Sequence, residues 1–167
     1  MSRKNYNVVL NSEYSTSDTA TNNNTNKNYY IDWSATLPDK NFKLTFTFIS
    51  EATYIIALSD IPVVTIDFLN YGNNYICQRS TVSYQATSSN ILGLLFPTYL
   101  DPVTYKAYFR ADKNFNSSIY LSRPRQNNFN VQIVDNNNPA LSWLDDNPIT
   151  PTTMAPYVLI LSFEECE

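Results

Sequence analysis

Along this chain, short stretches carry apolar residues at every second position, and loops of Asn, Asp, Ser, Thr and Pro separate them. Every other residue is apolar from Phe42 to Phe48, and the same holds from Phe129 to Ile133. A β-strand sends alternate side chains to opposite faces, so this period of two predicts strands with one face in a core and the other in solvent. The pattern indicates an all-β protein, an antiparallel β-sandwich.

The same criteria place further strands along most of the chain. The segments 29–34 and 42–49 flank a turn at 37–40, and we expect them to form a hairpin. In the segment 62–68, residues 64, 66 and 68 are expected to share one face. The remaining predicted strands are 6–10, 75–78, 81–85, 91–96, 105–109, 119–121, 129–134 and 157–163.

The connections between these strands favour one architecture. The chain is predicted to form one domain over 1–167, with 12–28 as a flexible polar loop. It contains neither Asn-Gly nor Asp-Gly, the dipeptides of tight hairpins, and several loops span ten residues or more. Long crossings between short strands are typical of Greek-key sandwiches, and the number of strands favours a single jelly roll with long Asn-rich loops over an immunoglobulin-like fold.

Charge and hydropathy exclude some functions. With a formal charge of −4 and only 11 Lys and Arg, the chain lacks the basic footprint of a protein that binds nucleic acid directly. The apolar run at Val8–Leu10 is too short for a signal peptide. The run at Tyr157–Leu161 is too short for a transmembrane segment and reads as a strand.

Catalytic and metal-binding signatures are sparse. The chain has no His, which removes the usual general base and the commonest transition-metal ligand. Cys77 and Cys166 are expected to be free thiols and are too few for a structural zinc site. We therefore expect no cofactor and no enzymatic activity, although Asp side chains and loop carbonyls leave a calcium site open. The sequons at Asn23 and Asn116 arise easily by chance in so Asn-rich a chain.

A glycosidase would need two carboxylates across a cleft, and the sequence offers few candidates for such a pair. Asp145-Asp146 and Glu164-Glu165 are adjacent pairs, and neighbouring residues on a strand point to opposite faces. Asp32 and Asp67 occupy outward positions of predicted strands. All of these carboxylates are expected to be solvated surface groups.

One segment and a set of aromatic residues are candidates for binding. Arg123 and Arg125 stand beside Asn and Gln at a strand entry, where guanidinium groups could contact a partner or an anion. The alternative is a solvated turn with a surface ion pair. Exposed tyrosines could form a platform for glycans, although tyrosines in a sandwich more often line the edge of the core. The candidates are Tyr71, Tyr75, Tyr99 and Tyr108.

A series of short motifs in order along the chain resembles proteins of large double-stranded DNA viruses. The motifs are Val8-Val9-Leu10-Asn11-Ser12, Tyr30-Ile31-Asp32-Trp33-Ser34, Phe42-Lys43-Leu44-Thr45-Phe46-Thr47-Phe48, Leu92-Gly93, Ser122-Arg123-Pro124 and Tyr157-Val158-Leu159-Ile160-Leu161-Ser162-Phe163. They span nearly the whole chain and consist mostly of strand patterns with a few polar residues, without a catalytic motif. The series is similar to single jelly-roll penton and minor capsid proteins.

The resemblance implies a structural role in a virion. It implies a penton (fivefold vertex) or minor capsid subunit that assembles with itself, as a homopentamer, and with the major capsid protein. The expected location is the virion capsid, after synthesis in the host cytoplasm without a signal peptide. The alternative is a virion spike or a receptor-binding or carbohydrate-binding head, which would bind a glycan.

Overall fold

The computed structural model describes residues 3–16, 26–52, 63–69, 76–78, 85–87, 91–100, 107–111, 118–134 and 156–166. These ranges hold eleven strands, one 3₁₀ turn and one short α-helix. The helical elements are η1 (Ser12–Tyr14) and α1 (Trp33–Thr36). The strands are β1 (Asn5–Asn11), β2 (Asn26–Tyr30), β3 (Asn41–Ala52), β4 (Val63–Ile66), β5 (Ile76–Gln78), β6 (Gln85–Thr87), β7 (Ile91–Leu100), β8 (Ala107–Ala111), β9 (Ile119–Ser122), β10 (Asn128–Val134) and β11 (Tyr157–Glu165).

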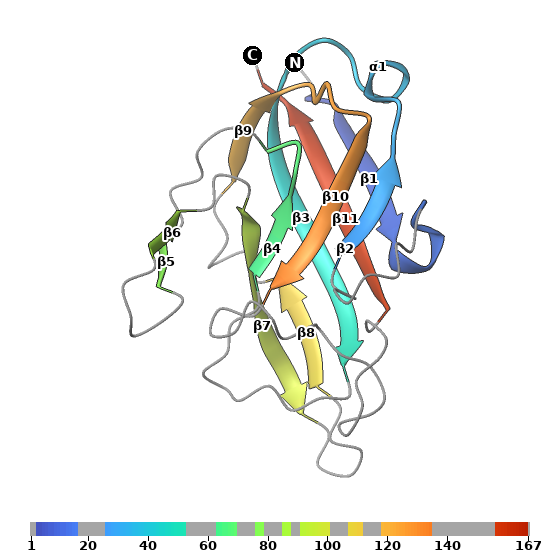
Figure 1. Cartoon of the computed structure of the whole chain (residues 1–167). Helices are drawn as coiled ribbons and strands as arrows, with labels where there is room; N and C mark the ends of the chain where they lie inside the picture. Colours follow the sequence, from blue (N-terminus) through green and yellow to red (C-terminus); the bar gives the residue numbers. More distant parts are fainter. Residues whose placement is uncertain are drawn as a thin grey trace.

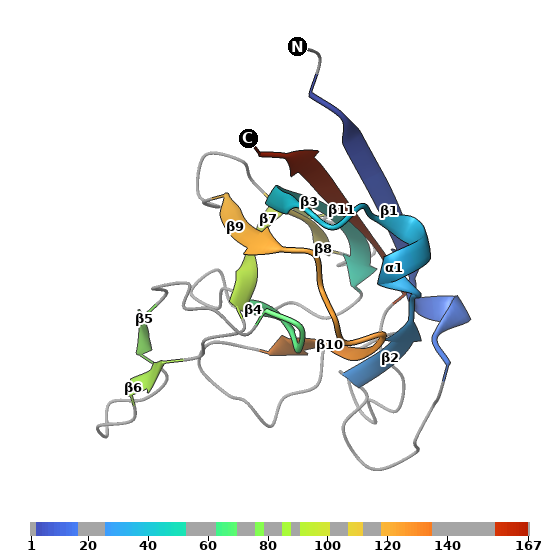
Figure 2. The ribbon, with the colours of Figure 1, turned by 90° about the horizontal axis from the view of Figure 1, so that it is seen from above.

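Two antiparallel sheets pack face to face as a sandwich (Figures 1 and 2). The first, called here the β1 sheet, has the order β1-β11-β3, and β8 and β9 pair with the far edge of β3. The second, the β2 sheet, has the order β2-β10-β4-β7. The described ends of the chain lie at the same end of the sandwich (Figure 1).

Two strands connect these layers to their neighbours. The first half of β7 pairs with β4, and its second half, from Leu95, pairs with β8, so that β7 passes from the β2 sheet to the β1 sheet. On β3, the segment Asn41–Leu44 pairs with β9 and Ile49–Ala52 pairs with β8. Strands β8 and β9 therefore share the place of a fourth strand in the β1 sheet.

The strand order confirms the predicted fold. Sequence-distant strands alternate in both sheets, with β1 beside β11 and β2 beside β10, which is the double Greek-key order of a jelly roll. The predicted antiparallel sandwich and its Greek-key connections are therefore correct. A further two-stranded ribbon, β5 with β6, lies apart from these sheets in the pairing pattern.

The core lies between the sheets and is filled by the apolar residues of the alternating strands. On β11, every second residue from Tyr157 to Phe163 is buried. Trp33, only 1% exposed, packs against the rings of Phe68, Phe129 and Phe163 at centroid distances of 5.2 to 5.6 Å. Such ring contacts add to the free energy that burial itself supplies.

The predicted hairpin between 29–34 and 42–49 is wrong. Strand β2 ends at Tyr30 and pairs with β10, whereas β3 pairs with β11, β8 and β9. Trp33 lies on α1 and not on a strand, because the Asp32 side chain caps the helix at its first turn. The apolar alternation at 29–33 thus crosses three elements. Tyr29 lies near the end of β2, Ile31 lies in the connection, and Trp33 lies on α1.

Three predicted boundaries also change. The predicted loop 12–28 is shorter at both ends, since Ser12–Tyr14 forms η1 and β2 begins at Asn26; residues 17–25 lie outside the described ranges. Strand β4 ends at Ile66, its four residues are all buried, and Phe68 lies in the following turn. Strand β6 begins at Gln85, so residues 81–84 of the predicted strand 81–85 are outside the description.

Candidate functional site

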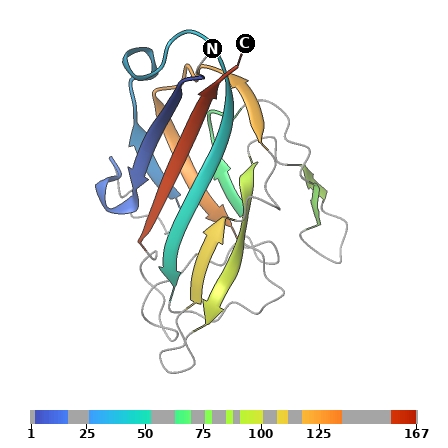
Figure 3. The same ribbon diagram turned by 180° about the vertical axis from the view of Figure 1, so that it is seen from behind.

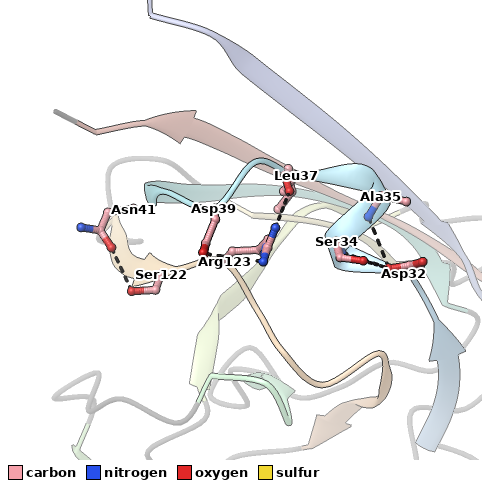
Figure 4. A network of polar contacts seen from close by, with 8 residues as sticks. All are labelled: Asp32, Ser34, Ala35, Leu37, Asp39, Asn41, Ser122 and Arg123. Atoms are coloured by element: carbon pink, nitrogen blue, oxygen red, sulfur yellow. Dashed lines mark hydrogen bonds and ion pairs between the residues drawn. The ribbon is translucent and has the colours of Figure 1, made fainter.

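Arg123 ties two connections of the sandwich together (Figure 4). Its backbone N–H donates to the carbonyl of Lys40 at 3.0 Å, and its Nη1 donates to the carbonyl of Leu37 at 3.2 Å. Its Nη2 lies 3.6 Å from Oδ1 of Asp39, which is 84% exposed. These bonds hold the start of the β9–β10 connection against the segment between α1 and β3. Arg123 therefore has a structural role, which is similar to the predicted alternative of a turn with a surface ion pair.

The neighbouring α1 is organised by Asp32. Its Oδ1 accepts hydrogen bonds from the backbone N–H groups of Ser34 and Ala35, at 3.0 and 3.3 Å, and from the Ser34 hydroxyl at 2.6 Å. These bonds, first that of the Ser34 hydroxyl and then that of the Ala35 N–H, hold the pKa of the carboxyl below its ordinary value, and the charge of Arg123 acts in the same direction. Asp32 is exposed, as predicted. It lies at the N-cap of α1 and not on the predicted strand.

Arg125 occupies a different environment. It is exposed, and no described residue pairs with its guanidinium group. Both arginines line a groove of about 740 Å³ beside β9. Its other described lining residues are Asn41, Phe42, Phe68, Tyr120, Leu121, Ser122, Pro124, Gln126 and Cys166. The lining of the groove is mixed, with polar side chains from Asn41, Ser122 and Gln126 beside the apolar Leu121 and Pro124.

The outer face of the β1 sheet is a second candidate surface (Figure 3). Its outward residues form rows across three strands, because the antiparallel register fixes which side chains are neighbours. We call the following eight positions the outer face: Asn7 and Val9 on β1, Val158, Ile160 and Ser162 on β11, and Thr45, Thr47 and Ile49 on β3.

The outer face carries no charged residue. Val9 is 62% exposed and stands in one row with Ile160 and Thr47. Ile49 is 50% exposed and stands opposite Val158 in the next row. Charged residues border it on two sides: Glu164 and Lys43 stand in the row beyond Ser162, and Arg110 on β8 is the register partner of Ile49. Its β-branched, hydroxyl and Asn side chains are exposed or partly exposed to solvent.

Ion pairs gather at the end of the sandwich beyond this face. Glu165 accepts hydrogen bonds from Lys40 Nζ at 2.6 Å and from the Tyr6 hydroxyl at 2.8 Å, and these two bonds lower the pKa of Glu165. Glu164 pairs instead with Arg3 and Lys43, at 3.2 and 3.7 Å. The two glutamates point to different sides, as predicted, and do not form a carboxylate pair. Both are surface groups held in ion pairs, with the side chains of Glu164 and Glu165 30% and 14% exposed, so they are less solvated than free surface carboxylates.

Asp67 also differs from its prediction. It lies in the turn after β4, half-buried, and its Oδ2 accepts the backbone N–H of Asn130 at 2.9 Å. The Asp67 N–H donates in return to the Asn130 carbonyl at 3.1 Å. The carboxylate thus extends the β4–β10 ladder by one more pair of bonds. Asp145 and Asp146 lie outside the described residues.

The remaining candidates are only partly described. Cys166 is a free thiol, half-buried, as predicted, and Cys77 lies on β5, where only the backbone is described. Tyr71 and Tyr75 lie outside the described ranges. Tyr99 and Tyr108 face one another on β7 and β8, again with only the backbone described.

Sequence reasoning missed Tyr120 and the outer face. Tyr120 is 69% exposed at the groove, and it stands in a row with Lys43 and Glu164. The alternation of 42–49 indicated which residues point outward but not which strands would lie beside them. The absence of charge across three strands appears only once their order is known.

Comparisons with known proteins add no assignment. No protein-family model matches the chain, and no curated protein or solved structure matches it. Within the described ranges, no group of three His, Cys, Asp or Glu side chains is placed to hold a metal ion. The helical segments that are described include none with the length and hydropathy to cross a bilayer.

Proposed function

We propose that this chain is a structural subunit of a viral capsid, either a penton at the fivefold vertex or a minor capsid subunit. In this role it assembles with copies of itself and with the major capsid protein. It is made in the host cytoplasm, resides in the virion capsid, and has no catalytic activity. The jelly-roll strand order and the resemblance of its motifs to single jelly-roll capsid proteins support the proposal.

The uncharged outer face is the observation that carries the proposal. Charged residues make up 16% of the chain, yet none occupies the eight outward positions from Asn7 to Ile49 defined above. Centres of protein interfaces are depleted of charge, because burying an unpaired charge is costly. A face of Val, Ile, Thr, Ser and Asn side chains costs less to desolvate than a charged face when a neighbour covers it.

The position of this face also suits lateral assembly. It extends to β1, whose outer edge has no strand partner among the described residues. A neighbour packed on Val9 would therefore cover an exposed apolar side chain and shield a strand edge at the same time. Because the acidic chains carry −4 each, contact through an uncharged surface also keeps their charges apart.

Native mass spectrometry of the full chain tests the proposal, because it counts subunits directly. A penton predicts five copies in the assembled species, held by a heterologous contact that closes as a ring. Three copies would support the virion spike or receptor-binding head instead. A single copy over a wide range of concentrations, with no binding to the major capsid protein, would overturn the proposal.

A further inference from the structure

The described lining of the groove beside β9 contains basic residues, whereas the chain as a whole is acidic. This described lining contains Arg123 and Arg125 and no Asp or Glu, in a chain whose formal charge is −4. Arg123 is engaged with Leu37 and Asp39, but Arg125 is exposed and has no described partner. The groove therefore presents one available guanidinium group beside the exposed Tyr120 and the partly exposed Leu121.

The same groove runs along an unpaired strand edge. The backbone N–H of Arg123 donates to the Lys40 carbonyl, so these two residues form a hydrogen-bonded pair of the β3–β9 ladder. Because such pairs alternate along an antiparallel ladder, Ile119 and Leu121 also direct their N–H and C=O groups toward β3. The alternate residues Tyr120 and Ser122 direct their N–H and C=O groups away from β3. No described strand lies on that side of β9. The N–H and C=O groups of Tyr120 and Ser122 therefore have no strand partner among the described residues, and their spacing matches that of a strand added to this edge.

We propose that this groove binds an extended peptide segment that carries an Asp or Glu side chain. The segment adds to the free edge of β9 as a further strand, and its carboxylate forms a bidentate ion pair with Arg125. Strand addition uses main-chain bonds for affinity and side-chain pockets for specificity. Here the exposed Tyr120 and the partly exposed Leu121 contact an alternate side chain, while Arg125 selects for negative charge.

The two kinds of contact favour a peptide over a glycan. Sugar hydroxyls could contact Tyr120 and Ser122, but they would not require the regular alternation of backbone donors and acceptors along β9. A neutral sugar would also leave Arg125 without a counter-charge. The inference does not depend on the capsid role, because it concerns a surface on the opposite edge of β3 from the strands that carry most of the outer face.

Selection from a display library of random twelve-residue peptides on the immobilised full chain tests this inference. The best peptides are synthesised, and their affinities are measured by fluorescence anisotropy. Enriched peptides should contain an Asp or Glu within an alternating apolar pattern. Their binding should place the Tyr120 and Ser122 amides among those protected from hydrogen exchange.

Two matched pairs of variants separate the contacts. R125Q should weaken binding about tenfold or more, whereas R125K, which keeps the charge, should lose less. S122P removes an outward N–H without removing a β3–β9 bond and should abolish strand addition, whereas S122A keeps the N–H and should bind like the parent. K27E on β2 serves as a distant charge control and should leave the affinity unchanged.

Three results would overturn the inference. The first is a library selection that enriches no acidic peptide. The second is peptide binding that R125Q and S122P both leave unchanged while the circular dichroism spectrum of each variant stays that of the parent. The third is binding of a glycan on an array that is lost in Y120A and retained in S122P, which would assign the groove to carbohydrate.

Discussion

The hydroxyl oxygens of Tyr29 and Tyr157 lie 3.0 Å apart in the core and form a hydrogen bond between the two sheets. Tyr29 stands on β2 and stacks on Phe129, and Tyr157 stands on β11 and stacks on Phe48. Each residue is at least 95% buried, so neither hydroxyl can turn to bulk water for a replacement partner. The pair therefore fixes how the sheets sit on one another.

Removing both hydroxyls of this pair should cost less than the sum of the costs of removing each one. Y29F or Y157F leaves a buried hydroxyl without its partner, and each should lower the free energy of unfolding by about 1–3 kcal/mol. The double variant should cost less than the sum of the single variants, because no orphaned hydroxyl remains. Urea unfolding followed by circular dichroism measures all four proteins. Y14F, at an 80% exposed position, is the control and should have no effect.

The same pair makes stability depend on alkaline pH. Burial raises the pKa of Tyr29 to about 12, from an ordinary value of 10, and burial also raises the pKa of Tyr157. Because the folded state holds these protons more tightly than the unfolded state, their contribution is complete below pH 10 and is lost as the pH rises toward 12. Unfolding midpoints measured from pH 8 to 12 should fall more steeply for the parent than for Y29F/Y157F. Equal slopes for the two proteins would contradict the assignment.

Trp33 should be among the most costly core residues to truncate. Its ring contacts Phe68, Phe129 and Phe163, and its Nε1 donates to the Gln126 carbonyl at 3.0 Å. W33A should lower the free energy of unfolding by about 3–5 kcal/mol, because it opens a cavity and leaves that carbonyl unbonded. W33F keeps most of the ring volume and should cost less. A W33A protein as stable as the parent in a thermal scan would argue against this placement.

Arg123 and Arg125 should respond differently to the same substitution. R123Q breaks the bonds to the Leu37 carbonyl and to Asp39 and should lower the free energy of unfolding by about 1 kcal/mol. R125Q removes an exposed group and should leave stability unchanged to within about 0.5 kcal/mol. Chemical unfolding of the two variants measures the difference. If both variants lowered the free energy of unfolding equally, Arg123 would have no structural role that Arg125 lacks.

The periodicity of the sequence was sufficient for the fold class and for most strands. Alternation from Phe42 to Phe48 marks β3 because its inward side must be apolar wherever it lies in the sandwich. The same logic failed at Trp33, where a short helix capped by Asp32 also places apolar residues inward. The local hydrophobic pattern predicts which residues are buried. It predicts which strand lies beside them only where a tight turn joins the two strands.

The binding surfaces were harder to predict for the same reason. The position of Arg123 and Arg125 beside Asn and Gln at a strand entry predicts a contact for both, but the difference between them depends on Leu37 and Asp39, which are more than 80 residues away in the sequence. The uncharged outer face depends on the order β1-β11-β3, which joins the first and last strands of the chain. Such long-range neighbours follow from the Greek-key crossings and not from any local motif.

The most direct test of the assembly proposal is the solution mass of the parent and of outer-face variants, measured by light scattering after size exclusion. The parent should have five times the mass of the 19.1 kDa chain. V9K and I49K, which place a charge on exposed positions of the outer face, should shift the mass toward that of the monomer. A35K, at an exposed position on α1, should not. A parent that stays at 19.1 kDa at every concentration and does not bind the major capsid protein, or an assembly that V9K and I49K leave intact, would contradict the account.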